Sequence, residues 1–240
     1  MPSSVHVTVL LEETLNLLEP RSGGCYVDGT LGGGGHAEAI LERSSPDGRL
    51  LGFDLDPEAL ERVCERLQRF GDRFVEVNAS FAELERWVRW FGFSPADGIV
   101  LDLGLSSDQL ADPKRGFAFQ AAAPLDMRFN PLPSTRSARE LVNRLELGEL
   151  TNLLYRYGEE PRAKAIARAI VQQRERKPIE TTDELALLIE RAVGHRRGKT
   201  HPATRTFQAL RIAVNAELTA LESVLPQAIE VLGPGGRLAV

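Results

Sequence analysis

The chain has 240 residues, of which 42% are hydrophobic and 26% are charged, and its formal net charge is −5. This length suffices for one large α/β domain, or for one domain with an insertion, and the composition excludes a disordered or fibrous protein. No apolar run reaches the roughly 18 residues that a membrane helix needs, and residues 1–13 lack the pattern of a secretory signal. We therefore predict a cytoplasmic protein that has no membrane partner.

The two cysteines, Cys25 and Cys64, do not form a CxxC pair. We interpret them as reduced thiols of a cytosolic protein. The sequence also has no Cys and His cluster with the spacing of metal ligands, so no metal site is predicted.

Basic residues are unevenly distributed along this acidic chain. Residues 191–216 contain six Lys or Arg and no Asp or Glu, and residues 161–177 contain six more against one acidic residue, Glu175. A local basic face can bind a polyanion even on an acidic protein. Charge alone does not distinguish such a face from an ordinary solvated helix surface.

The first hundred residues alternate short apolar runs with helical patterns. The predicted strands are 25–27, 49–53, 73–77 and 98–101, and the predicted helices are 35–42, 58–70 after Pro57, and 81–90. This βαβ order predicts an α/β fold with a parallel sheet that is covered by helices on both faces.

The pattern changes after residue 106. Residues 106–133 are loop-like and contain four prolines, and helical patterns follow at 138–144, 149–156, 162–174 and 182–192. The last of these helices has a capping box formed by Thr181 or Thr182 with Glu184.

The polar stretch 194–202 separates these helices from a long helical pattern, 203–231, which Pro226 is expected to kink or split. A turn is predicted at 233–236, and a strand begins at residue 237. The sheet domain is thus expected to comprise residues 1–106 and 203–240, and the inserted helical domain residues 107–202. Because the last apolar run stops at Val240, we expect the sequence to be a fragment of a longer protein.

The segment Asp28–His36, DGTLGGGGH, joins the first predicted strand to the first predicted helix. Glycines allow the backbone to take positive φ and to approach a ligand closely, and parallel sheets bind ligands beyond the carboxyl ends of their strands. We therefore predict a cofactor loop. The alternatives are a flexible turn and, for His36 alone, a residue that merely begins a helix.

Asp54 follows the second predicted strand, about twenty residues after the glycine loop, where a carboxylate can accept hydrogen bonds from ribose hydroxyls. Asp56 is expected to cap the helix that begins at Pro57. A glycine loop followed by an acidic residue fits both NAD and S-adenosylmethionine. The glycines lack the usual G-x-G-x-x-G frame and no second mononucleotide-binding half follows, which favours S-adenosylmethionine over an NAD-dependent dehydrogenase.

Asp102 follows the fourth predicted strand in the segment LDLGLSS. In a methyltransferase sheet this position lies beside the methyl group of the cofactor. A hydrogen-bond acceptor can localise the lone pair of an exocyclic amine and accept its developing positive charge, so Asp102 is the candidate catalytic residue. The alternative is a strand-end Asp that caps Ser106 or Ser107.

The segment 201–215, HPATRTFQALRIAVN, reads as the start of the long helix. Arg205 and Gln208 fall near one helical face, and Arg211 falls near another. Arg205 and Thr206 near a helix N-terminus could cradle a phosphate. We predict substrate contacts from Arg205, Thr206, Gln208 and Arg211, although an ordinary amphipathic helix explains the segment equally well.

Four segments, in this order, resemble the bacterial ribosomal RNA small-subunit methyltransferase H family, also called MraW: residues 6–13, 28–36, 101–110 and 201–215. Shorter matches lie at 115–119, 124–128 and 157–160. The resemblance implies a Rossmann-like class I methyltransferase domain with an inserted, substrate-binding helical domain. It also implies transfer of a methyl group from S-adenosylmethionine to N4 of a cytosine in the decoding region of small-subunit (16S) ribosomal RNA.

The same resemblance implies a set of cofactor contacts, with Phe81 packing against the adenine. The set comprises Gly34, Gly35, His36, Asp54, Phe81, Asp102 and Gln109. The target cytosine must leave its stack, so the helical insertion and the basic segments are expected to grip the flanking RNA. Naked RNA and the assembled ribosomal subunit both remain candidate partners, and a homodimer is left open.

The sequence departs from the family pattern at two places. Gly33 stands where family members often carry Arg or Lys, and the family continues beyond residues 235–238 with a segment near the active site.

A DNA amino-methyltransferase would usually show a D-P-P-Y motif where this chain has DLGL at 102–105. A cofactor-binding or RNA-binding module without activity is the remaining alternative.

Overall fold

The computed structural model describes residues 8–120, 122–132, 135–194 and 201–240. The chain forms two compact units, one comprising Met1–Asp108 with Leu218–Val240, and the other Gln109–Glu217. None of the helices in the described ranges is long and apolar enough to cross a membrane.

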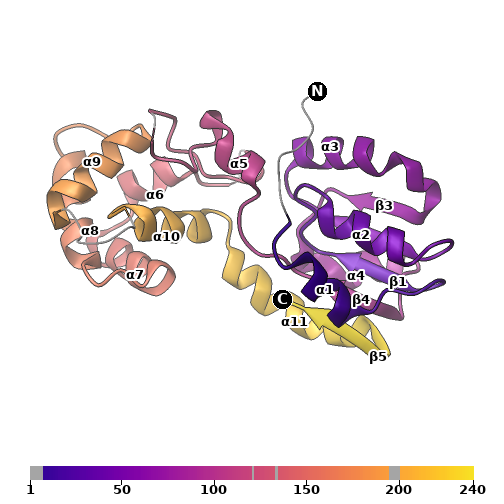
Figure 1. Cartoon of the computed structure of the whole chain (residues 1–240). Helices are drawn as coiled ribbons and strands as arrows, with labels where there is room; N and C mark the ends of the chain where they lie inside the picture. The colour runs from indigo at the N-terminus through magenta and orange to yellow at the C-terminus, as the bar shows by residue number, and fades with distance from the viewer. Residues whose placement is uncertain (1–7, 121, 133–134, 195–200) are drawn as a thin grey trace. The chain divides into compact units, whose positions relative to one another are not determined.

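The first unit contains a parallel sheet with helices on both faces (Figure 1), which confirms the predicted fold class. Its described strands are β1 (Cys25–Asp28), β2 (Arg49–Phe53), β3 (Phe74–Val77), β4 (Ala96–Val100) and β5 (Leu232–Ala239), in the order β3-β2-β1-β4-β5. The order runs outward from β1 in both directions, so the topological switch point lies between β1 and β4. Ligands of open parallel sheets bind at such a point, beyond the carboxyl ends of the strands.

Alternating strand side chains fill two separate cores, because successive residues of a strand point to opposite faces. Tyr26 and Leu50 pack with α1 (Leu11–Leu18), α2 (Gly35–Arg43) and α3 (Pro57–Leu67). On the other face Val27 and Leu51 pack with α4 (Leu84–Trp90) and α11 (Glu217–Val231). The two cores hold the carboxyl ends of the strands in fixed positions.

Helix α1 was not predicted. It has eight residues, and its N-cap, Leu10, makes no side-chain capping hydrogen bond. Its burial of Leu15 and Leu18 against the sheet therefore stabilises it more than any local signal does. Two other boundaries also differ slightly from the prediction, because 3₁₀ turns occupy Gln68–Arg73 and Phe81–Glu83.

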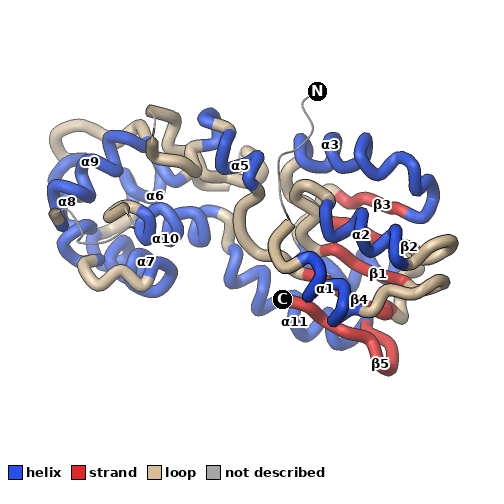
Figure 2. Tube along the Cα trace, in the orientation of Figure 1, coloured by secondary structure: helices blue, strands red, loops and turns tan. Residues whose placement is uncertain are grey.

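The second unit consists of helices and loops over its described residues, as the blue and tan tube of Figure 2 shows. Its helices are α6 (Ala138–Arg144), α7 (Leu147–Gly158), α8 (Ala163–Arg174), α9 (Thr182–Val193) and α10 (Thr204–Val214), with a 3₁₀ turn at Pro113–Arg115. The short helix α5 (Ser107–Ala111) begins in the first unit and ends in the second. Thr181 and Glu184 form the capping box that begins α9, as predicted.

The long helical pattern 203–231 is divided at a different place from the one predicted. Ala216 has a φ of 50°, in the left-handed region, and separates α10 from α11, whereas Pro226 lies inside α11. Helix α10 packs closely on α7, since a Cβ at Gly158 would lie 2.5 Å from the backbone oxygen of Arg205. Residues 203–217 therefore belong to the second compact unit, beyond the expected insertion of 107–202.

The predicted turn at 233–236 forms part of β5. Leu232 pairs with Ala96 and Arg237 pairs with Gly98, so the four residues between them bulge out of the ladder. Glycine and proline make such an irregularity tolerable at the edge of a sheet.

Candidate functional site

Three carboxylates lie at the carboxyl ends of neighbouring strands. Asp28 ends β1, Asp54 follows β2, and Asp102 follows β4. Since the strand order is β2-β1-β4, the three residues share one edge of the sheet on both sides of the switch point. The sequence predicted roles for Asp54 and Asp102, but it treated Asp28 only as the first residue of the glycine segment.

Asp28 is the most buried of the three carboxylates, with 1% of its surface exposed. Its Oδ1 accepts a hydrogen bond from the Thr30 N–H at 2.9 Å, and its Oδ2 has no hydrogen-bond partner among the described residues. Burial raises the pKa of Asp28 to about 7; the nearby Asp102 and Asp54 add to the rise, and the Thr30 N–H opposes it. A buried oxygen without a partner favours a site that receives a hydrogen-bond donor or a cation.

The glycine loop is tied to both neighbouring strands. The Leu31 N–H donates to the Phe53 carbonyl at 2.9 Å, and the Gly32 N–H donates to Asp54 Oδ2 at 2.8 Å. On the other side the Asp102 N–H donates to Thr30 Oγ1 at 2.7 Å. The loop therefore has a defined conformation, which argues against the flexible-turn alternative.

Gly34 shows why the loop needs glycine. Its φ is 77°, a conformation that L side chains rarely adopt, and a Cβ there would lie 3.1 Å from Val63 Cγ1. At Gly35, a Cβ would lie 1.8 Å from Thr8 Oγ1. The backbone at the start of α2 is therefore packed too closely for side chains at either position.

Asp54 orders the loop through its carboxylate. Oδ2 accepts from Gly32, and Oδ1 accepts from the Asp56 N–H at 2.9 Å. The Asn78 amide donates to the Asp54 carbonyl at 3.0 Å and so links the end of β3 to the end of β2. Asp56 accepts from the Glu58 N–H and caps α3, as predicted.

His36 and Asp102 approach each other across the loop. His36 is buried in the first turn of α2, and its Nδ1 lies 3.8 Å from Asp102 Oδ2. The Asp102 side chain is 42% exposed, so this carboxylate remains accessible while its backbone is fixed by Thr30.

The first unit also brings Phe81 to this edge. Phe81 follows β3 and is half-buried. Its Cβ packs beside Gly29, since a Cβ built on Gly29 would lie 3.3 Å from the Cβ of Phe81. Gln109 differs from the other predicted cofactor contacts, because it belongs to the second compact unit, where it is buried in α5.

The predicted substrate contacts on α10 have mixed positions. Thr206 is fully buried and its Oγ1 has no hydrogen-bond partner among the described residues. Arg211 is bound to Glu217 through two hydrogen bonds of 2.7 and 3.0 Å, and its side chain is only 18% exposed. Burial raises the pKa of Glu217, and Arg211 opposes the rise. Thr206 therefore lies in the interior of the second unit, and the half-buried Arg211 is held by Glu217. Their assignment as substrate contacts stays a prediction.

Arg205 and Gln208 differ from these two. The Arg205 guanidinium donates to the Glu159 carbonyl at 2.9 Å, so it closes the end of α7. Gln208 is exposed. The phosphate cradle expected from Arg205 and Thr206 stays a prediction, as does the substrate contact of the exposed Gln208.

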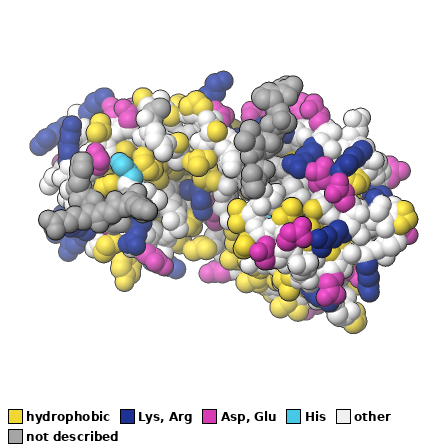
Figure 3. Space-filling view, in the orientation of Figure 1, with side chains coloured by type: hydrophobic (Ala, Val, Ile, Leu, Met, Phe, Trp, Pro, Cys, Tyr) yellow, Lys and Arg dark blue, Asp and Glu magenta, His cyan; other side chains and the backbone are white. Residues whose placement is uncertain are grey.

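Exposed basic residues gather on α8 and α9 of the second unit (Figure 3). Four exposed basic side chains make no hydrogen bond or ion pair with the described residues: Lys164 and Arg168 on α8, Arg176 just after α8, and Arg191 on α9. Arg196, Arg197 and Lys199, which belong to the predicted basic stretch, lie outside the described residues. Within the described ranges, no group of three or more His, Cys, Asp or Glu residues is arranged to hold a metal ion.

Comparisons with known proteins agree on one family. Residues 3–240 match the model of the MraW methylase family. The chain is 55% identical over 238 residues to "Ribosomal RNA small subunit methyltransferase H" of Thermomicrobium roseum, which covers 99% of this chain and 73% of the relative. A relative of the same name from Dehalococcoides mccartyi is 53% identical over 98% of this chain and 66% of its own length.

A solved rRNA methylase from Streptococcus thermophilus is 22% identical over 39% of this chain and 53% of its own, with a TM-score of 0.33. This likeness is too limited to add to the argument.

Proposed function

The chain belongs to the MraW methylase family, and from this premise we propose that it is an S-adenosylmethionine-dependent methyltransferase of small-subunit ribosomal RNA. The proposed product is a cytosine methylated at N4 in the decoding region, formed in the cytoplasm. The observation that carries the proposal is the cluster of three strand-end carboxylates around an ordered glycine loop at the switch point of the sheet.

The residues present fit S-adenosylmethionine. This cofactor has a cationic sulfur, an ammonium group, a carboxylate and two ribose hydroxyls. The unpartnered Oδ2 of Asp28 suits a cation or a donor at the sheet edge, and Asp54 suits the ribose hydroxyls. The first turn of α2, beginning at Gly35, suits the carboxylate because helix N-termini attract anions.

Each remaining cofactor contact has one proposed role. Gly34 and Gly35 let the loop backbone approach the cofactor closely, and Phe81 packs against the adenine. His36 supports Asp102 through the 3.8 Å contact between them. Gln109 is retained as a contact on the strength of the family resemblance alone.

The chemistry of the site follows from one property of the cofactor and one of the protein. S-adenosylmethionine supplies an electrophilic methyl group on its sulfur. Asp102 presents a half-exposed carboxylate at the same edge, where it can accept a hydrogen bond from the exocyclic amine of a cytosine. Such an acceptor keeps the lone pair of nitrogen available and stabilises the positive charge that develops there. Alignment of the methyl group with the target nitrogen contributes the rest of the rate enhancement.

The second unit is proposed to bind the RNA. Lys164, Arg168 and Arg176 are exposed on or just after α8 and have no acidic partner among the described residues, so they can neutralise phosphates. Gln208 is the candidate contact on α10. The substrate is proposed to be the RNA within the ribosomal subunit, and naked RNA is the alternative.

Methyl transfer to ribosomal RNA tests the proposal. The chain is incubated with methyl-labelled S-adenosylmethionine and either isolated small-subunit RNA or whole subunits, and the RNA is digested to nucleosides. We expect label in N4-methylcytidine. We expect Asp102→Ala to slow transfer by roughly 100-fold while cofactor affinity stays within a few-fold of wild type.

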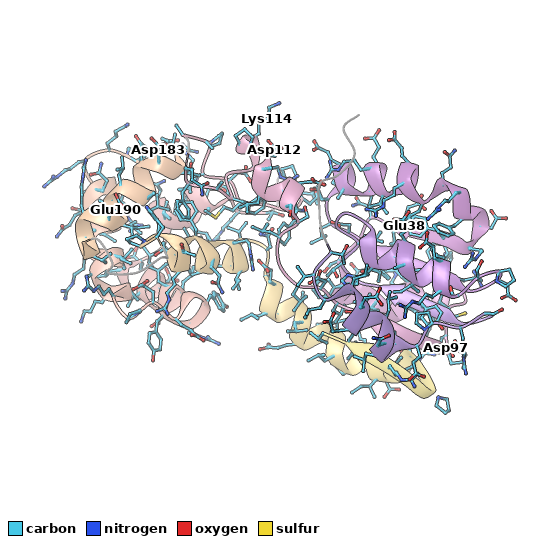
Figure 4. The ribbon with its side chains drawn as sticks, in the orientation of Figure 1. Glu38, Asp97, Asp112, Lys114, Asp183 and Glu190 are labelled. Atoms are coloured by element: carbon cyan, nitrogen blue, oxygen red, sulfur yellow. The ribbon has the colours of Figure 1, made fainter. Side chains whose placement is uncertain are left out.

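Asp97→Ala is the matched control, because Asp97 lies at the opposite end of β4 (Figure 4), where it binds Arg21 and the Cys25 N–H. Label in another nucleoside would overturn the N4-cytosine assignment. Near-normal transfer by Asp102→Ala would remove the catalytic role of Asp102.

A further inference from the structure

Helix α3 touches the glycine loop through two residues one turn apart. Val63 packs against Gly34, where a Cβ would lie 3.1 Å from Val63 Cγ1. Arg66, three residues later on the same face of the helix, donates from Nη1 to the Gly33 carbonyl at 2.7 Å. The loop is thus held from a third element, in addition to β2 and β4.

The Arg66 guanidinium is itself held in place by Glu38. Nε and Nη2 of Arg66 donate to Glu38 Oε2 at 2.9 and 2.5 Å. Figure 4 labels Glu38 on α2, next to α3. Because the guanidinium is planar and its donors are fixed in a fork, the bonds to Glu38 leave Nη1 directed at Gly33. Arg66 therefore connects α2, α3 and the loop.

The Gly33–Gly34 peptide group is fixed on both of its sides. Its carbonyl accepts from Arg66, and its N–H donates to the Leu31 carbonyl at 2.7 Å. Glycine has more backbone freedom than any other residue, so a loop with four consecutive glycines would lose much entropy if it became ordered only on binding a ligand. Ordering the loop beforehand removes this cost from the binding step.

We propose that Arg66 is a positioning residue, which holds the glycine loop in its cofactor-binding conformation through the Gly33 carbonyl. It acts through the backbone of the loop and need not touch the cofactor. This inference rests on the proposed use of the loop for S-adenosylmethionine.

Arg69 supplies a matched control. It lies one turn further along, carries the same charge and also donates to Glu38, at 3.0 Å, but its described contacts do not include the loop. We expect Arg66→Gln to weaken S-adenosylmethionine binding about tenfold in calorimetric titration, and Arg69→Gln to leave it within about twofold. Arg66→Lys keeps the charge but lacks the fork, so we expect a loss close to that of Arg66→Gln.

Two further measurements separate positioning from general stabilisation. In methyl transfer, Arg66→Gln should raise the KM for S-adenosylmethionine and leave kcat at saturating cofactor unchanged, because the ligand itself then orders the loop. In the absence of cofactor, the Gly32 and Gly34 amides should exchange hydrogen faster in Arg66→Gln than in Arg69→Gln, with similar thermal midpoints.

The exchange experiment does not require cofactor binding, so it tests the role of Arg66 even if the proposed function fails. Equal exchange in the two variants would overturn the proposal. Equal loss of cofactor affinity in the two variants would also overturn it, as would wild-type affinity in Arg66→Lys.

Discussion

At the scale of single residues, the three strand-end carboxylates differ mainly in their exposure to water. Asp28 is buried, Asp54 is half-buried and bound to two backbone N–H groups, and Asp102 is 42% exposed. Burial raises the pKa of Asp28 to about 7 and the other two carboxylates add to this rise. Of the three, Asp102 is the most exposed to water, and Asp28 is the one whose protonation is linked to stability.

The raised pKa of Asp28 predicts a pH dependence of stability. Because the folded state binds this proton more tightly than the unfolded state does, the contribution is fully present below about pH 4 and is lost as the pH rises to about 7. Asp28→Asn keeps an acceptor for Thr30 but cannot ionise. We therefore expect the wild type to lose about 3 kcal/mol of unfolding free energy relative to Asp28→Asn between about pH 5 and about pH 8. Urea unfolding of both proteins measures this, and parallel pH profiles would show that Asp28 ionises normally in the folded chain.

At the scale of elements, the junction between α10 and α11 lies at the boundary between the two compact units. Helix α10 belongs to the second unit, and α11 from Leu218 onward belongs to the first. Asn215 caps the end of α10, and its side chain donates to the Met127 carbonyl and accepts from the Phe129 N–H, both in the loop before α6. Ala216 then takes a φ of 50°. Left-handed backbone costs a residue with a Cβ roughly 1 kcal/mol, so the sequence accepts local strain at this position.

Glycine substitutions at two alanines test this junction. Ala216→Gly should raise the unfolding free energy by about 1 kcal/mol, because glycine adopts positive φ without strain. Ala220→Gly, inside α11, should lower it by about 1 kcal/mol through lost helix propensity. Thermal or urea unfolding of the two variants should therefore give shifts of opposite sign. A loss of stability in both would mean that Ala216 is helical in solution.

The same elements show what the sequence could and could not predict. The strand bounds of β1 to β4 were predicted closely, because parallel buried strands give continuous apolar runs followed by Asp or Asn. Helix α1 was missed, since it depends on packing of Leu15 and Leu18. Pro226 was expected to kink or split the helical pattern 203–231, which is instead divided at Ala216, and alanine gives no sequence signal for positive φ.

At the scale of the whole molecule, the site depends on contacts between residues that are distant in sequence. The glycine segment, Asp54 and Asp102 could be predicted because each follows a strand, and the topology of a parallel sheet brings such positions together. The bond from Arg66 to Gly33 and the pairing of Arg211 with Glu217 could not be predicted, because both depend on how helices pack. The burial of Thr206 could not be predicted for the same reason, because helical periodicity indicates which residues share a face but not what that face packs against.

Calorimetric titration of the chain with S-adenosylmethionine, repeated with Asp54→Ala, tests the central claim most directly. We expect saturable binding at one site by the wild type, and its loss in a folded Asp54→Ala variant, because this change removes both the proposed ribose acceptor and the bond that orders Gly32. Absence of binding by the folded wild-type chain, or equal binding by both proteins, would contradict a cofactor site at this edge of the sheet.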